Sequence, residues 1–324
     1  MQLRRRILAS IIASLGAAGC ANAQTYPVRP ITMIIPFSSG GMDTIGRIVA
    51  ERMRGSLGQP VIVENVAGAS GSIGVGRAVR AAPDGYTLSY GGFVPHVLNG
   101  AVYSLNYDLI NDLEPVALVA TQPLLIVAKK ATPANNLKEL IAWLKANPDK
   151  ALQGTAGSGS AEHVVGVAFQ RETGTRFGFV PYRGGGQIMQ DLIGGQIDML
   201  IGVTAISLAQ VQAGTVKAYA VTAQRRLPAA PDVPTVDEAG LSGFHVSSWH
   251  GIWVPKHTPK SIIIQLNAAV VDALADPGVR KRLADMGQEI FPREQQTPEA
   301  LGAFHKAEIE KWWPIIKAAN IKGE

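Results

Sequence analysis

A strand, a glycine-rich turn and a helix start follow one another early in the chain, and this order limits the fold to the α/β class. The β-rich apolar run 31–36 leads into the turn Ser38–Gly41. Apolar residues then recur at helical spacing over 45–53, and Asp43 stands at the predicted helix start. The first N–H groups of a helix lack partners within it and carry the positive end of its dipole. Because glycine leaves these groups uncovered, the turn is suited to hold an anion.

The same order recurs through the N-terminal third of the chain. Predicted strands at 61–65 and 86–90 each run into a turn rich in glycine or serine. Ligands of open α/β sheets bind beyond the carboxyl ends of the strands. The turns Ser38–Gly41, Gly68–Gly74 and Gly91–Gly92 are therefore candidate ligand contacts. Short connections also need glycine for conformational reasons alone, which is the alternative interpretation of each turn.

A second α/β unit in the middle of the chain repeats the motif. The turn Gly157–Ser160 follows a short predicted strand and opens a helix that carries His163 in its first turns, and Tyr182–Gly184 precedes another helix. No Gly-Lys-Ser/Thr follows the first turn, and the third glycine of a dinucleotide fingerprint is missing. Neither Ser158 nor Ser160 stands in a nucleophile-elbow context, and no acid–histidine pair can be argued. The sequence thus favours a binding site over the alternative of a serine hydrolase.

Length and order together predict two lobes. The chain of 324 residues exceeds what one ordinary hydrophobic core holds. Long β-rich runs at 118–129 and 244–254 flank the middle unit and would serve as two crossover strands. We expect a discontinuous first lobe, 24–126 with 244–324, and a second lobe, 127–243. A cleft between lobes joined by two strands is a favoured ligand site and permits closing motion.

The first 23 residues have the character of a secretory signal peptide. Arg4–Arg6 precede the apolar run 7–18, and small residues end at Ala23, after which cleavage is expected. The segment holds three of the 30 basic residues, none of the 25 acidic ones and the one cysteine, Cys20. The mature chain would thus be nearly neutral, without disulfides, and placed in the periplasm, with no indication of nucleic-acid binding. Lipidation of Cys20 stays open as an alternative.

Histidines and acids show no pattern that predicts a metal or cofactor site. The six histidines are scattered, and the nearest approach to a metal pair is His250 with His257. Paired carboxylates for acid–base catalysis are not apparent. We therefore expect no enzyme activity, metal or cofactor.

A series of short motifs, each weak alone, becomes specific through its order and covers essentially the whole mature chain. In this order the sequence resembles the Bug family, the periplasmic solute receptors of tripartite tricarboxylate transporters. The motifs are Tyr26–Ile31, Ile34–Asp43, Val63–Asn65 with Gly68, Pro83–Leu88, Gly157–Ser160 with His163, Val180–Gly185, Gly195–Asp198 and Ala230–Thr235.

The resemblance implies a two-lobe periplasmic binding protein of the Venus flytrap type. Members bind small carboxylates, namely amino acids, di- and tricarboxylates or aromatic acids, and pass them to membrane transporter subunits. We expect a monomer with these partners. A sensory role, in which the loaded protein is presented to a membrane receptor, stays open beside transport.

The resemblance also places ligand contacts in the turns of both lobes. Asp43 matches the helix-start aspartate of the family and either binds a ligand ammonium group or caps the helix. The sequence departs from the family at 92–96, where Phe93 or His96 would reshape the pocket, and Arg183 is the one nearby cation. The expected contacts are Phe37, Ser38, Ser39, Gly40, Gly41, Asp43, Gly92, Phe93, Gly157, Ser158, Gly159, Ser160, Tyr182, Arg183 and Gly184.

Overall fold

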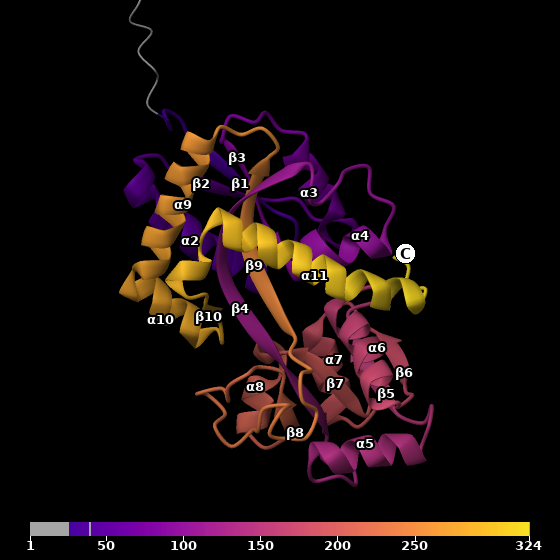
Figure 1. The fold of residues 1–324 in the computed structure, drawn as a ribbon. Helices are drawn as coiled ribbons and strands as arrows, with labels where there is room; N and C mark the ends of the chain where they lie inside the picture. Colours follow the sequence, from indigo (N-terminus) through magenta and orange to yellow (C-terminus); the bar gives the residue numbers. More distant parts are fainter. Residues whose placement is uncertain (1–25, 39, 324) are drawn as a thin grey trace, which may run out of the picture.

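The computed structural model describes residues 26–38 and 40–323. The predicted signal peptide, Cys20 and Ser39 lie outside these described residues. Figure 1 shows two groups of elements, one above the other, with the strands β4 and β9 running between them. We call the group built on β1–β3 the first lobe and the group built on β5–β8 the second lobe.

The first lobe draws on both ends of the chain. Its N-terminal elements are β1 (Ile31–Ile35), α2 (Gly41–Leu57), β2 (Val61–Asn65), a 3-10 turn (Ala69–Gly71), α3 (Ser72–Val79), β3 (Thr87–Gly92), a π-helical turn (Phe93–Leu98) and α4 (Asn99–Val102). Its C-terminal elements are α9 (Lys260–Ala275), α10 (Pro277–Asp285), β10 (Glu289–Ile290), a 3-10 turn (Arg293–Gln295) and α11 (Pro298–Ala318).

The second lobe is made from the middle of the chain. Its elements are α5 (Leu137–Ala146), β5 (Leu152–Thr155), α6 (Ala161–Thr173), β6 (Gly178–Pro181), α7 (Gly185–Ile193), β7 (Met199–Val203), α8 (Thr204–Gln212) and β8 (Val216–Val221). The crossover strands are β4 (Leu113–Lys129) and β9 (Ser247–Pro255). Both predicted crossover runs are therefore strands, and β4 continues through Pro123, which stands opposite Ser247 where β4 passes from the first lobe to the second.

Each lobe has a parallel sheet, and the crossover strands join the two. The strand order is β2-β1-β3-β9-β4-β7-β5-β6, with β8 and β10 also paired to β4. The pairs β1·β2, β1·β3, β5·β6 and β5·β7 are parallel. All pairs that involve β4 or β9 are antiparallel.

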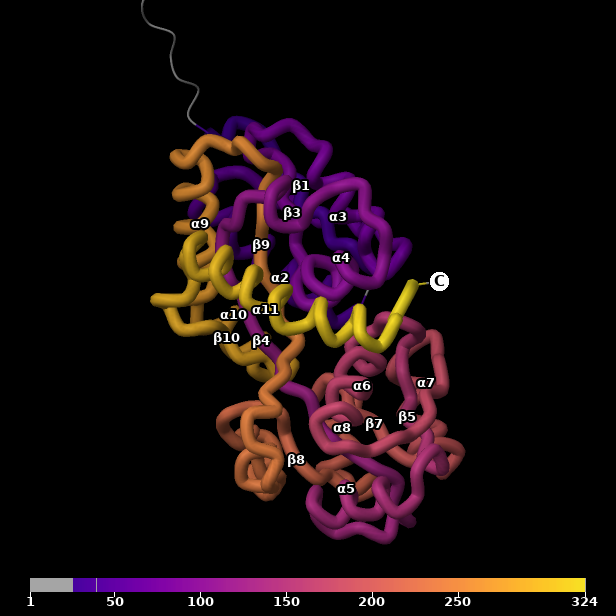
Figure 2. The backbone as a smooth tube through the Cα atoms, turned by 45° about the vertical axis from the view of Figure 1, so that its right-hand side comes forward, coloured from indigo at the N-terminus to yellow at the C-terminus, as the bar shows by residue number. Residues whose placement is uncertain are grey.

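Helices cover both faces of the sheet, and alternate residues of β4 point into different cores. In the first lobe, α2, α9 and α10 share one core with the sheet, whereas α3 and α11 lie over the other face. In the second lobe Leu124 and Ile126 face α5 and α6, and Leu125 and Val127 face α7 and α8. Figure 2 shows α11 crossing in front of the crossover strands, with its end close to α6.

The carboxyl ends of the two parallel sheets face each other across a short gap. β3 ends at Gly92, opposite His250 of β9, and β7 ends at Val203, opposite Leu124 of β4. Only a few residues of β4 and β9 separate these two points. The turns that follow the parallel strands of both lobes are therefore directed toward the same gap. Among the described residues no single helix is long and apolar enough to cross a membrane, although the bent pair α9–α10 meets the length and composition limits jointly.

Candidate functional site

A pocket of about 580 Å³ lies between the lobes, next to the crossover strands. The first lobe contributes the start of α2, Gly41 and Met42, and the turn after α10, 285–288. The second lobe contributes Val203 and one side of α8, from Ala205 to Gln212, and the crossover strands contribute Gln122, Ser248 and His250. Among the described residues that line the pocket there is no lysine or arginine. An anion bound here would therefore depend on backbone N–H groups and neutral side chains.

The start of α2 offers such N–H groups. Gly40 is the N-cap residue and provides no side-chain hydrogen bond, so the first N–H groups of the helix are uncovered on the pocket side. A Cβ added at Gly40 would meet nothing closer than the carbonyl oxygen of Ser38, 3.9 Å away, and one added at Gly41 would meet nothing within 4 Å. The space in front of the helix is thus open to a ligand.

Asp43 does not cap α2, so the capping alternative is wrong. The helix begins two residues earlier, at Gly41, and Asp43 lies in its first turn with 6% of its surface exposed. Its carboxylate accepts hydrogen bonds from Arg47 Nε, at 2.9 and 3.0 Å, and from Asn65 Nδ2, at 2.9 Å. Burial alone would raise the pKa of Asp43, but the hydrogen bonds from Arg47 and Asn65 bring that pKa below its usual value. Through its hydrogen bond with Asn65, Asp43 instead links the first turn of α2 to the end of β2.

Replacing Asp43 with asparagine is expected to lower the free energy of unfolding at pH 7 by about 1 kcal/mol, because the charge-assisted bond to half-exposed Arg47 is lost. A carboxyl with a lowered folded-state pKa stabilises the fold above its unfolded pKa, and this contribution disappears as the pH falls through the folded value. The deficit should therefore shrink below pH about 4, as measured by urea unfolding from pH 7 to pH 3.

Asp149→Asn is the matched control, since the ion pair of Asp149 with Arg176 is mostly exposed. Its free energy of unfolding should change by less than about 0.5 kcal/mol at every pH. A deficit at Asp43 that did not change with pH would contradict the assigned ion pair.

The other two glycine-containing turns of the first lobe, at Gly71 and Gly92, are closely packed inside the lobe. A Cβ at Gly71 would lie 3.0 to 3.3 Å from Pro95, Pro36 and Phe37, and Gly71 has φ +96°, so this turn requires glycine for close packing. Gly92 is also closely packed, and a Cβ there would lie 1.7 Å from the carbonyl oxygen of Trp249.

Phe93 and His96 are buried in the first lobe rather than placed at the pocket wall. The ring of Phe93 is 1% exposed and packs edge-to-face on Trp312, with ring centroids 5.1 Å apart. His96 is fully buried and stacks on Trp253 at 3.9 Å. We therefore leave both rings out of the proposed ligand contacts.

The turn 157–160 contacts the first lobe but does not line the pocket with Gly41. Ser158 Oγ donates to the carbonyl oxygen of Lys322 at 2.7 Å, and a Cβ on Gly159 would lie 2.7 Å from Val102 in α4. Ser160 is the N-cap of α6 and accepts from the N–H of His163, while His163 Nδ1 accepts from the N–H of Gly159. Several N–H groups at this helix start are therefore already paired.

The first turn of α6 also carries an acid of its own. Glu162 is 8% exposed, and burial raises its pKa, while hydrogen bonds from its own N–H, from the Ser160 hydroxyl and from the Ala156 N–H act in the opposite direction. A ligand carboxylate at this position would meet a second carboxyl group. The turns before α2 and α6 were expected to bind a carboxylate in the same way. The α6 turn is less suited to this, because it carries a carboxyl group of its own and several of its N–H groups are already paired.

The turn 182–184 places an open helix start in the second lobe. Gly184 is the N-cap of α7 without a side-chain bond, and a Cβ there would meet nothing within 4 Å. Tyr182 donates its hydroxyl to Asp191 at 2.7 Å, and burial together with this acid raises its pKa to about 12. Arg183 is exposed, and its guanidinium forms no ion pair within the described residues.

Sequence reasoning missed the start of α8. Val203 is its N-cap without a side-chain bond, and the Thr204 hydroxyl donates instead to the carbonyl oxygen of Pro123 at 2.8 Å. One glycine, Gly202, lies just before this N-cap, but the strand–helix junction lacks the run of glycine and serine that identified the other turns. The pocket nevertheless brings α8, rather than α6, opposite α2.

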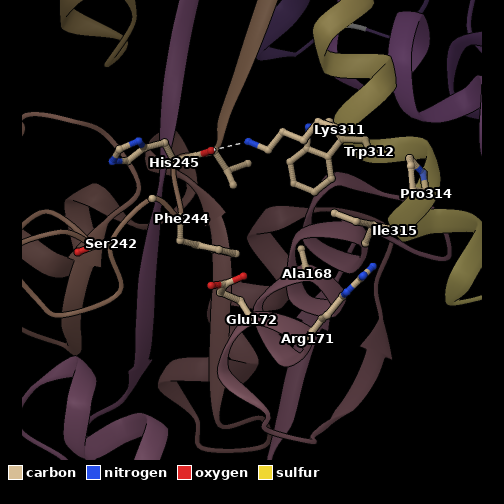
Figure 3. A pocket seen from close by; sticks show the side chains of 12 residues that line it. Ala168, Arg171, Glu172, Ser242, Phe244, His245, Lys311, Trp312, Pro314 and Ile315 are labelled. Atoms are coloured by element: carbon tan, nitrogen blue, oxygen red, sulfur yellow. Dashed lines mark hydrogen bonds between the residues drawn. The ribbon is translucent and has the colours of Figure 1, made fainter.

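A different pocket, of about 450 Å³, lies on the α11 side of the crossover strands (Figure 3). Lys311 Nζ donates to the carbonyl oxygen of His245 at 2.8 Å, and Trp312 and Phe244 point toward the same space. Since β9 alternates its side chains, Trp249 packs on Phe304 of α11 whereas His250 faces the pocket at α2. Within residues 26–38 and 40–323, no group of three potential metal ligands is close enough to hold an ion.

The comparisons with known proteins decide the family. The model of the tripartite tricarboxylate transporter family receptor matches residues 45–321. This chain belongs to that receptor family. A UPF0065 protein from the TAR-I ttuE-ttuC' intergenic region of Agrobacterium vitis is 39% identical over 98% of the receptor and 93% of its own length. The periplasmic binding protein BugD is 38% identical, with a TM-score of 0.78 over 92% of the receptor and all of BugD.

Two structures similar to the receptor contain dicarboxylates. MatC from Rhodopseudomonas palustris with bound malate is 36% identical, with a TM-score of 0.78 over 90% of the receptor and all of MatC. A second R. palustris protein, with adipate, is 30% identical, with a TM-score of 0.79 over 92% of the receptor and 99% of that chain. The predicted two-lobe fold with two crossover strands is confirmed, and the receptor is a periplasmic solute-binding protein rather than an enzyme.

Proposed function

We propose that this receptor binds a small carboxylate between its lobes and delivers it to the membrane subunits of a tripartite tricarboxylate-type transporter. The observation that carries the proposal is the uncapped start of α2, which opens onto a pocket whose described lining has no cationic side chain. Backbone N–H groups at a helix start stabilise a carboxylate both by hydrogen bonds and by the helix dipole.

The proposed contacts are those that the geometry leaves open. In the first lobe they are Ser38, Gly40 and Gly41. In the second lobe they are Gly184 and the exposed Arg183, which belong to the open start of α7 and do not line the pocket with Gly41 in this structure. The side of α8 from Ala205 to Gln212 is added to them because it lines the same pocket as Gly41. Malate in MatC and adipate in its R. palustris relative support a dicarboxylate as the first class to test.

The proposed division into lobes is 24–126 with 244–324 against 127–243, and the protein is proposed to act as a monomer. The first proposed boundary lies inside β4, a few residues beyond Pro123, after β4 has begun to pair with β7 and β8, and the second lies just before β9. Binding by both lobes would draw them together, so that transporter subunits could distinguish loaded from empty receptor.

A thermal-shift screen of dicarboxylates, amino acids and aromatic acids on the purified mature chain is expected to identify stabilising ligands. A ligand at 100 times its dissociation constant should add about 2.7 kcal/mol to the free energy of unfolding. Primary amines and uncharged amides of the same sizes are the controls and should give no shift. If no carboxylate raises the melting temperature, the proposed function is wrong.

A further inference from the structure

Three polar side chains form the floor of the pocket between α2 and α8. Gln122, His250 and Gln288 all line it, although only 5%, 4% and 6% of their surfaces are exposed. They come from β4, from β9 and from the turn before β10, so both crossover strands contribute. The turn lies beside Gln122, because a Cβ on Gly287 would be in ordinary contact with Gln122 Nε2, at 3.5 Å.

Two polar atoms of this floor have no hydrogen-bond partner within the described residues. They are Oε1 of Gln288 and Nδ1 of His250. Gln122 is partly satisfied, since its Nε2 donates to the carbonyl oxygen of Met286 at 3.3 Å. A buried polar atom without a partner is unfavourable, so a ligand group that reached these two atoms and paired with them would gain binding energy.

The charges around the floor indicate what that group is. The one acid in the lining, Asp285, has an exposed side chain, and its carboxylate forms an ion pair with Lys281 Nζ at 2.7 Å. Burial lowers the pKa of His250 to about 4, so its imidazole is neutral at neutral pH. A second carboxylate or an ammonium group at the floor would therefore be desolvated without an opposite charge.

A hydroxyl group fits these requirements without such a cost. It both donates and accepts, so it can pair with the Gln288 amide in either orientation and with the His250 imidazole in either tautomer. An apolar wall of Ile45, Val203 and Ile206 stands beside the floor and would enclose the carbon skeleton.

We propose that the receptor selects hydroxylated carboxylates and binds their hydroxyl group with Gln122, His250 and Gln288. The inference rests on the proposed function, because it takes the carboxylate to be held at the start of α2. It adds that an acid lacking the hydroxyl leaves the floor unpaired and binds more weakly.

Isothermal titration calorimetry with three matched pairs of acids tests the inference on the mature chain. The pairs are malate with succinate, 2-hydroxyglutarate with glutarate, and mandelate with phenylacetate, and each differs by one hydroxyl group. In at least one pair the hydroxylated acid should bind about tenfold more tightly or better. The inference is overturned if the hydroxyl-free acid binds as tightly in every pair that binds, or if a hydroxyl-free acid of the wider screen binds and none of the hydroxylated acids does.

Variants then locate the selectivity. Gln288→Leu should reduce the preference to about threefold or less while the hydroxyl-free acid keeps its affinity, and His250→Phe should act similarly with the ring stacking on Tyr90 retained. Gln295→Leu, at an exposed position, is the control and should keep the wild-type preference. A preference that survives in both floor variants would contradict the assignment. Failure of every carboxylate to bind would instead contradict the proposed function itself.

Discussion

Replacing Gly40 with valine is expected to weaken carboxylate binding by about 100-fold while the free energy of unfolding changes little. The backbone of Gly40 is extended, with φ 169°, so valine can adopt it, and its Cβ would meet only the carbonyl oxygen of Ser38 at 3.9 Å. The branched side chain would cover the first N–H groups of α2. Loss of one or two hydrogen bonds to a charged group costs roughly 1.5 to 3 kcal/mol each, and about 1.4 kcal/mol corresponds to a factor of ten.

Calorimetric titration with the best acid from the screen measures this effect, and urea unfolding checks stability. Gly184→Val places the same side chain at the open start of α7, where a Cβ meets nothing within 4 Å. Its loss of affinity measures the contribution of the second lobe, for comparison with that of the first lobe. Gly302→Ala is the control within α11, since its Cβ would lie 3.5 Å from Pro115, an ordinary contact. Unchanged affinity of Gly40→Val would mean that the carboxylate lies elsewhere in the gap.

Replacing Gly92 with alanine should have the largest effect on stability. The added Cβ would lie 1.7 Å from the carbonyl oxygen of Trp249 and 3.1 Å from the Cα of His250, so the clash is with backbone that cannot rotate away. Relief requires β3 and β9 to separate where they are paired. We expect a loss of about 3 kcal/mol or more in the free energy of unfolding.

Thermal and urea unfolding measure this loss, with Gly41→Ala as the matched control. The same methyl group at Gly41 meets nothing within 4 Å, so the melting temperature of that variant should stay within about 2 °C of the wild type. If Gly92→Ala were as stable as Gly41→Ala, the close approach of β3 to β9 would not hold in solution.

Local sequence signals predicted most of the order of elements, but not the helical segments Phe93–Leu98 and Asn99–Val102. Apolar periodicity and the glycine turns predicted the strand–turn–helix repeats, and the flanking β-rich runs predicted β4 and β9. These features depend on residues that are close together in the chain, so a single sequence is enough to predict them.

The parts that sequence reasoning missed depend on residues distant in the chain. Asp43 was expected either to bind a ligand ammonium group or to cap its helix, but the parallel pairing of β1 with β2 places Asn65 beside its carboxylate. Phe93 was expected near the ligand, but Trp312, more than 200 residues later, buries it. The Gly157–Ser160 turn resembles the α2 turn in sequence, yet His163 and Glu162 occupy its helix start.

The crossover strands also determine how the lobes can move. β4 and β9 are hydrogen-bonded to each other through the transfer point, where Gln122 pairs with Ser248 and Pro123 with Ser247. A two-stranded antiparallel ribbon bends across its width but resists sliding of one strand along the other, because sliding breaks every cross-strand bond at once. Bending of this ribbon therefore moves the lobes relative to each other at a lower cost than sliding of β4 along β9.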